Sequence, residues 1–188
     1  MTAHVKIARA NAILPEQMPQ RLTIVSGGQS GVDRAALDAA IARGIPYGGW
    51  CPKGGWAEDF PDPPGVLARY PLLQETPSAD PAERTEWNMR DSDACLILVD
   101  GSGVAVSQGT ALTGDLAARY AKPLLVVDVS AADAVERMTA WLVALPAARA
   151  SDASFRVMIG GPRESEAPGI YGRARGALGQ LLAVHRLA

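Results

Sequence analysis

The chain has 188 residues, a length that suits one domain with a substantial hydrophobic core. Its formal net charge is −2, and acidic and basic residues are dispersed, so no basic face predicts nucleic-acid binding. No apolar run reaches membrane-spanning length, and the N-terminus has no apolar core of signal-peptide length. We therefore expect a cytoplasmic protein without membrane association.

The cysteines and histidines limit the chemistry that the chain can perform. Cys51 and Cys95 lie too far apart in sequence for a zinc or redox motif, which favours reduced cytosolic thiols. His4 and His185 lie near the two termini. A Ser-His-Asp triad or a histidine metal site would have to recruit one of them, so we expect neither and predict no metal site.

Strands and helices are predicted to alternate along the chain. Residues 1–20 show little pattern and form an expected loose extension, followed by one domain over residues 21–188. A helix containing Ala36, Leu37, Ala40 and Ile41 is expected to stop at Gly44. A long irregular connection follows over residues 52–80. The expected strands are residues 22–27, 45–52, 94–100, 124–129 and 155–161.

Capping signals place the later helices. Asp80 as N-cap, followed by Pro81 and Glu83, predicts a helix to about residue 91. The next glycine turn opens a helix that stops before Pro123, and residues 130–133 resemble a capping box for a helix with an apolar stripe. The last helix is expected over residues 170–182. Continuous apolar strands that alternate with helices predict a single-domain, Rossmann-like, doubly wound α/β fold with a mostly parallel sheet.

Three glycine-rich turns each lead from a predicted strand toward a helix. They read SGGQSGVDR, GSGVAVSQGT and IGGPRES, and they begin at Ser26, Gly101 and Ile159. None matches the GxGxxG or GxxxxGK[ST] pattern. Unpaired N–H groups at helix N-termini attract anions, and glycine lets the backbone approach closely. Three such turns on one sheet edge predict an anion site, although each alone is equally well explained as a structural turn.

Several side chains near these turns are candidates for ligand contacts. Asp33 and Arg34 fall in the first helical turn, where Asp33 either complements the helix dipole or accepts from a ribose hydroxyl or pterin-like amine. Arg163 is placed to bind phosphate or a surface carboxylate. Lys53 offers a point charge, or is a solvated loop lysine. Glu58 is a candidate for polar ring edges or a metal, or is an exposed loop acid.

Two further patterns are weaker. Trp50, Trp56 and Trp87 offer stacking faces for a flat ring, but core or interface packing explains most of them equally well. Residues 105–109 nearly match the GxSxG elbow of hydrolases. The match lies several residues beyond its strand and no internal histidine is present to activate Ser107, so we reject a hydrolase triad.

Taken together, several blocks resemble the molybdenum carrier family, a circularly permuted branch of a Rossmann-like nucleotide-sensing superfamily that includes cytokinin-activating phosphoribohydrolases. The blocks include SGGQSGVDRAALDAAI, YPLLQETPSADPAERTEWNMRDSDACLIL, KPLLVVD and GPRESEAPGIY, within residues 22–175. The resemblance implies a homo-oligomeric cytosolic protein with a phosphate-recognising cleft and, for one branch, binding of molybdenum cofactor, a pterin with one phosphate. It implies an anion cradle made of Gly27, Gly28, Gln29, Ser30 and Gly31, with Gly109 and Thr110 opposite.

The chain departs from its hydrolase relatives at one position. Where their GGxGTxxE motif has a glutamate, this chain has Thr113, and the nearest acid is Asp115 on a different face of the helix. We therefore predict a carrier or sensor of a phosphorylated small molecule, with an N-glycosidic phosphoribohydrolase as the alternative and a pure interaction module last. The candidate ligand-binding residues are Gly27, Gly28, Gln29, Ser30, Gly31, Asp33, Arg34, Lys53, Glu58, Ser107, Gly109, Thr110, Gly161 and Arg163.

Overall fold

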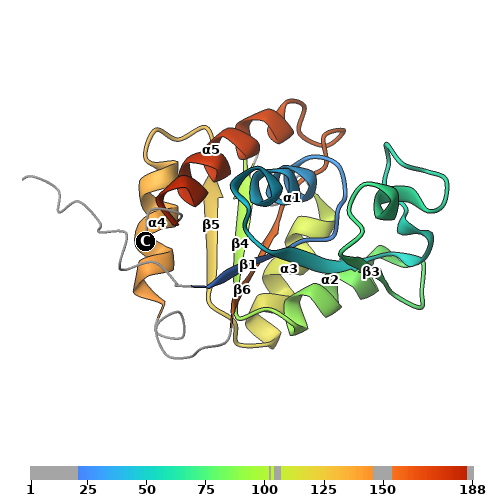
Figure 1. Ribbon diagram of the computed structural model, residues 1–188. Helices are drawn as coiled ribbons and strands as arrows, with labels where there is room; N and C mark the ends of the chain where they lie inside the picture. The colour runs from blue at the N-terminus through green and yellow to red at the C-terminus, as the bar shows by residue number, and fades with distance from the viewer. Residues whose placement is uncertain (1–20, 102, 104–106, 146–153, 186–188) are drawn as a thin grey trace, which may run out of the picture.

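A computed structural model describes residues 21–101, 103, 107–145 and 154–185, so the expected extension over residues 1–20 lies outside the described residues. Within the described part, six parallel strands form one sheet in the order β3-β2-β1-β6-β4-β5. The predicted Rossmann-like α/β class is confirmed (Figure 1). The strands are β1 (Leu22–Val25), β2 (Tyr47–Cys51), β3 (Leu73–Glu75), β4 (Ala94–Val99), β5 (Leu124–Asp128) and β6 (Phe155–Gly160).

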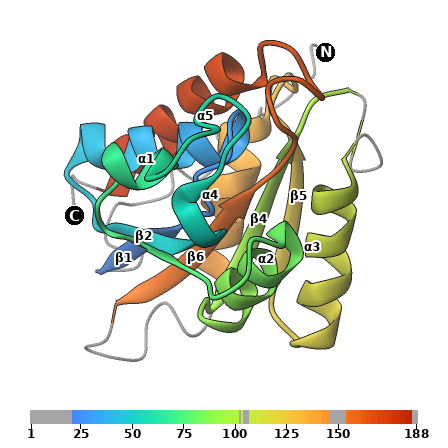
Figure 2. The same ribbon diagram turned by 90° about the vertical axis from the view of Figure 1, so that its right-hand side faces the viewer.

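In the described ranges, five α-helices cover the two faces of the sheet. One layer holds α1, α4 and α5, and the opposite layer holds α2 and α3 (Figures 1 and 2). In the described residues, no helix has both the length and the apolar composition that a membrane crossing requires. The helices are α1 (Val32–Arg43), α2 (Pro81–Arg90), α3 (Gln108–Arg119), α4 (Ala134–Ala144) and α5 (Ile170–His185).

Strand β4 shows why its apolar residues follow one another without a break instead of alternating with polar ones. All six of its residues are buried. Leu96 and Leu98 pack in the cluster under α1, α4 and α5, while Cys95, Ile97 and Val99 pack in the cluster under α2 and α3. A strand with helices on both faces must be apolar on both. Burial also raises the pKa of the Cys95 thiol to about 12, so this cysteine is a core residue, as expected.

The connection over residues 52–80 contains more structure than expected. It holds two short 3₁₀ helices, Lys53–Gly55 and Gly65–Ala68, and the edge strand β3, which pairs only with β2. Strand β3 was missed because it spans three residues with one buried side chain, which is too short for a periodic signal.

The predicted cap is confirmed at α2 and is wrong at α4. Asp80 caps α2 by accepting a hydrogen bond from the Ala82 amide at 2.9 Å, as predicted. The capping box over residues 130–133 is wrong: Asp133 makes no side-chain capping bond, and the Ser130 hydroxyl bonds the Asp128 carboxylate. The helix begins only at Ala134, so Ser130 lies outside its first turn and its hydroxyl donates to the preceding aspartate instead.

The strand order brings the three glycine turns together. Strand β6 lies between β1 and β4, so the turns that follow β1, β6 and β4 leave three neighbouring strands at their carboxyl ends. In open parallel sheets, this edge is where ligands bind. The first and last turns touch directly, since the Val32 amide donates to the Pro162 carbonyl at 3.2 Å.

This close approach predicts that Gly31→Ala strongly lowers the free energy of unfolding. Gly31 has φ 73°, and a Cβ there would lie 2.4 Å from the Pro162 carbonyl oxygen. We expect the substitution to cost about 1–3 kcal/mol from backbone strain alone, with a further loss from the clash, measured by urea denaturation. The matched control is Gly176→Ala in α5, where a Cβ meets nothing within 4 Å. That change should stabilise by about 0.5–1 kcal/mol, and equal effects of the two would contradict the packing described.

Candidate functional site

A cavity of about 470 Å³ lies at the carboxyl edge of the sheet, between α2, α3 and the turn after β6. All three glycine turns contribute to its wall, so the spatial convergence that the anion-site prediction required is present. Its polar lining comprises Gln29, Asp33, Asp80, Arg84, Thr85, Ser107, Gln108, Thr113, Arg163 and Glu166, with Gly109, Gly160 and Gly161 contributing backbone.

The candidate residues divide into those that line the cavity and those that do not. Gln29, Asp33, Ser107, Gly109, Gly161 and Arg163 line it. Whether any of them binds a ligand stays a prediction. The candidates outside the lining are Gly27, Gly28, Ser30, Gly31, Arg34, Lys53, Glu58 and Thr110.

Asp33 forms a buried ion pair across the cavity wall. Its carboxylate lies 2.9 Å from the Arg84 guanidinium, and the side chains are 6% and 13% exposed. Burial raises the pKa of the Asp33 carboxyl, while Arg84 and the backbone amides of Gln29 and Gly27 oppose that rise. Arg84 comes from α2 and Asp33 from α1, so the pair joins the helices on opposite faces of the sheet.

Gly27 makes room for this pair. A Cβ at Gly27 would lie 2.0 Å from a terminal nitrogen of Arg84, so only glycine lets the guanidinium rest on the turn. The amides of Gly27 and Gln29 already face the Asp33 carboxylate, and the Ser30 amide donates to the Gln29 side chain. Several amides of the first turn are thus engaged within the protein.

The amides of the α3 N-terminus are more accessible. Ser107 caps the helix by accepting from the Thr110 amide at 3.4 Å, which leaves the amides of Gln108 and Gly109 without intrahelical partners. Both residues are exposed and border the cavity. The buried Thr110 hydroxyl has no hydrogen-bond partner among the described residues. The N-terminus of α3 therefore brings backbone N–H donors without intrahelical partners to the cavity wall.

Arg163 supplies a second cation to the cavity. Its guanidinium lies over the Trp56 ring, 5.5 Å from the centroid, and forms no ion pair within the described residues. Its backbone amide donates to the Glu166 carboxylate at 2.8 Å, which holds the turn after β6 in place. Among the tryptophans, Trp56 thus supports a cavity residue, while Trp50 and Trp87 pack edge to face at 4.7 Å.

Glu58 connects three segments and does not line the cavity. Its carboxylate accepts hydrogen bonds from the Ser30 hydroxyl and, at 2.6 Å, from the Ser165 hydroxyl. These hydrogen bonds lower the pKa of the Glu58 carboxyl against an opposing desolvation effect, which is the largest single influence on it. Glu58 therefore acts as a tie between the loop and the two turns, a role that its sequence context did not indicate.

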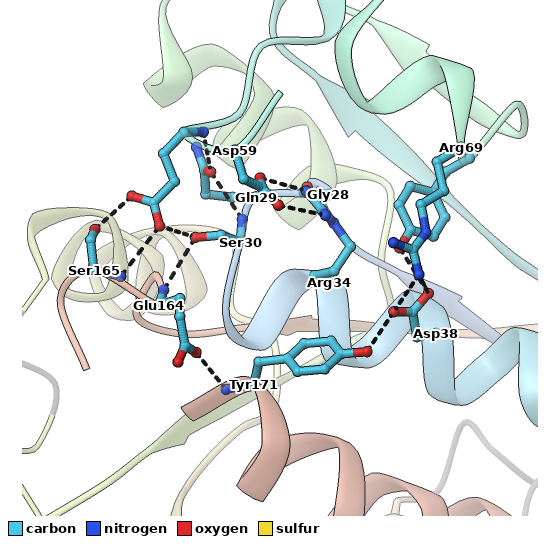
Figure 3. Close-up of polar contacts among 12 residues, drawn as sticks. Gly28, Gln29, Ser30, Arg34, Asp38, Asp59, Arg69, Glu164, Ser165 and Tyr171 are labelled. Atoms are coloured by element: carbon cyan, nitrogen blue, oxygen red, sulfur yellow. Dashed lines mark hydrogen bonds and ion pairs between the residues drawn. The ribbon is translucent and has the colours of Figure 1, made fainter. Parts of the chain in front are cut away.

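Two of the basic candidates also lie outside the cavity. Arg34 is 5% exposed and makes a bidentate pair with Asp59 at 2.9 and 3.0 Å (Figure 3). It also donates to the Gly28 carbonyl and lies over the Phe60 ring, so its hydrogen-bonding capacity serves the fold. Lys53 is exposed and far enough from the cavity that its side chain does not line it.

Sequence reasoning missed Arg84, Gln108 and Glu166 as lining residues. Arg84 shares a helix face with Asn88, and that spacing was visible, but nothing in the sequence shows that this face meets Asp33. Asn88 instead bonds both backbone groups of Trp50, at 2.8 and 2.9 Å. In the part of the chain that the structure describes, no three His, Cys, Asp or Glu side chains gather as a metal site.

The buried pair predicts that Arg84→Met lowers the free energy of unfolding by an amount that depends on pH. Without the guanidinium, the pKa of Asp33 should rise further, because burial is then opposed only by backbone amides. A carboxyl with a raised pKa in the folded state stabilises the fold below its unfolded pKa and loses that contribution as pH rises through the folded pKa. We expect a loss of about 3–5 kcal/mol near pH 8 and a much smaller one near pH 5, by urea denaturation.

The double variant Asp33→Asn with Arg84→Met is the control for that experiment. It has no titrating carboxyl at this position, so the pH dependence should disappear. An equal loss for Arg84→Met at both pH values would show that the ion pair is not what this arginine contributes.

Comparisons with known proteins identify the family of the chain. The model of the circularly permutated YpsA SLOG family matches residues 24–182. A crystal structure from Syntrophus aciditrophicus, described as a "Putative molybdenum carrier protein", is similar to this chain at 38% sequence identity and a TM-score of 0.74, covering 89% of this chain and 98% of that one. No curated protein matches. The chain is a member of the circularly permutated YpsA SLOG family.

Proposed function

We propose that the chain binds a phosphorylated small molecule in the 470 Å³ cavity, as a carrier or sensor, with the phosphate at the N-terminus of α3. The observation that carries the proposal is the meeting of accessible amides at Gln108 and Gly109 with the guanidinium of Arg163 around one cavity. Amides and a guanidinium together match the oxygens of a phosphate.

The rest of the cavity suits an organic group. Leu112 from α3 and Met158 from β6 provide an apolar surface behind the polar lining. Small-molecule sites combine such surfaces with a few oriented polar groups. A cavity of this size holds a flat ring together with its phosphate.

Molybdenum cofactor is the ligand that we favour. Its single phosphate suits one helix N-terminus, and the related protein from Syntrophus aciditrophicus bears a molybdenum carrier name at 38% identity. We extend that name to this chain as a proposal only, together with the cytoplasmic location and homo-oligomeric state that the family resemblance implies. A nucleotide derivative is the other ligand class that the same donors accept.

A phosphoribohydrolase is the alternative, and one observation keeps it in consideration. Asp33 presents a buried carboxyl with a raised pKa at the cavity wall. The other carboxylates considered from sequence are less well placed, since Asp115 is exposed and outside the cavity lining and Glu58 ties the loops. Thr113 lines the cavity where the hydrolase motif has its glutamate. Binding without cleavage is therefore the function we favour.

Gln108→Pro tests the proposed phosphate site at the N-terminus of α3. Proline at the first helical position removes one amide and is tolerated there, and the preceding Ser107 already has the extended conformation that proline requires, with φ −131° and ψ 126°. We expect unchanged thermal stability and about tenfold weaker binding of molybdenum cofactor or nucleoside monophosphates, measured by calorimetric titration. Gln108→Ala keeps the amide and should bind like wild type. Wild-type protein that binds no member of this panel would refute the proposed function.

A cleavage assay separates the alternative from binding. Wild-type protein is incubated with nucleoside monophosphates and the free base is measured by chromatography. We expect no release. Release that Asp33→Asn abolishes and Asp115→Asn leaves intact would establish the hydrolase instead, because Asp33 lines the cavity and Asp115 does not.

A further inference from the structure

The orientation of the Gln29 side-chain amide is determined by its neighbours. Its oxygen accepts hydrogen bonds from two backbone amides, those of Ser30 and Glu58, each at 2.9 Å. Backbone N–H groups donate and cannot accept, so the oxygen rather than the nitrogen of Gln29 must face them. A glutamine on an open surface would be free to turn its amide over; this one is not.

This orientation leaves the Nε2 group for the cavity. Gln29 is 6% exposed and lines the cavity wall. Its oxygen is engaged by the two amides, and its Nε2 group donates to no residue that the structure describes. That group has two N–H donors and no acceptor capacity. The Nε2 group is therefore left to donate to a molecule that reaches it from the cavity.

The segments that hold Gln29 are themselves tied together (Figure 3). The backbone amide of Glu58 donates to Gln29, and the carboxylate of the same residue accepts hydrogen bonds from the Ser30 and Ser165 hydroxyls. The Glu164 amide also donates to the Ser30 hydroxyl at 3.2 Å. Because the turn after β1, the loop at Glu58 and the turn after β6 are joined in this way, the donor keeps one position without any ligand.

We propose that Gln29 determines ligand specificity by presenting its NH₂ group to a hydrogen-bond acceptor of the ligand. It selects an acceptor, such as a phosphate oxygen, and rejects a donor at that position. The identity of the acceptor as phosphate rests on the proposed function. The orientation of the amide does not, because it follows from the two backbone donors alone.

Two substitutions of similar length separate orientation from binding. Gln29→Glu keeps an oxygen for both backbone amides but replaces the donor with an acceptor, ionised near pH 8. Gln29→Met removes the oxygen and the donor together, leaving the amides of Ser30 and Glu58 without a partner. Thermal stability is measured for both variants and for wild type, together with calorimetric titration by inorganic phosphate and adenosine monophosphate.

We expect the two variants to rank differently in the two measurements. Gln29→Glu should melt within a few degrees of wild type yet bind phosphate at least about tenfold more weakly, since a carboxylate repels the anion. Gln29→Met should melt at a clearly lower temperature and lose less binding than Gln29→Glu. Binding by Gln29→Glu equal to wild type would overturn the inference.

A purely structural role predicts another result. In that case binding follows stability, and Gln29→Met is the weaker binder. If Gln29→Glu is destabilised as much as Gln29→Met, the assigned orientation is wrong and the inference fails. If wild type binds neither probe, the proposed phosphate site and the phosphate acceptor both fail, and the order of melting temperatures alone decides the orientation of the amide.

Discussion

The parallel pairing of β1 with β6 is the constraint on which the site depends. Residues 22–25 pair with residues 155–158, so an N-terminal strand is joined to a C-terminal strand at the centre of the sheet. Because β4 pairs with the other edge of β6, the turns after all three strands leave the same sheet edge. The approach is so close that Gly31 and Gly161 leave no room for a side chain. The cavity exists because these turns meet there.

The polar groups around the cavity are of two kinds: those paired with one another and those left without a hydrogen-bond partner in the described part of the protein. Charged groups of the first turn and its neighbouring loop largely satisfy one another: Asp33 pairs with Arg84, and Arg34 with Asp59. The Asp33–Arg84 pair is buried on both sides, whereas Asp59 is 47% exposed. A buried pair contributes little net stability, but the loss of one partner is strongly destabilising, so it holds a specific arrangement. The donors left for a ligand come from the start of α3, from Arg163 and from the oriented amide of Gln29. These donors are the basis of our proposal that the cavity binds an acceptor-rich molecule, and a carrier, as proposed, would need no nucleophile.

The site residues show where sequence reasoning ends. The glycine turns were recognisable because anion seats require small residues next to helix starts, and their convergence followed from the parallel strands. The roles of Arg34 and Glu58 were not recognisable from the sequence. A charged residue near a glycine turn gives the same sequence pattern whether its side chain contacts a ligand or another residue of the protein. Arg84 was missed as a cavity residue because its partner, Asp33, lies 51 positions earlier in the chain.

By itself, the sequence determined the α/β class, most strands, the Asp80 cap and the three turns, because these depend on local composition and periodicity. It did not determine the strand order, the short edge strand β3, or which polar side chains face the cavity. Those were decided by tertiary structure, since they depend on contacts between segments far apart in the chain. The same difference explains Gln29: its neighbour Ser30 is local, but Glu58, which completes the orientation of its amide, is brought to it only by the fold.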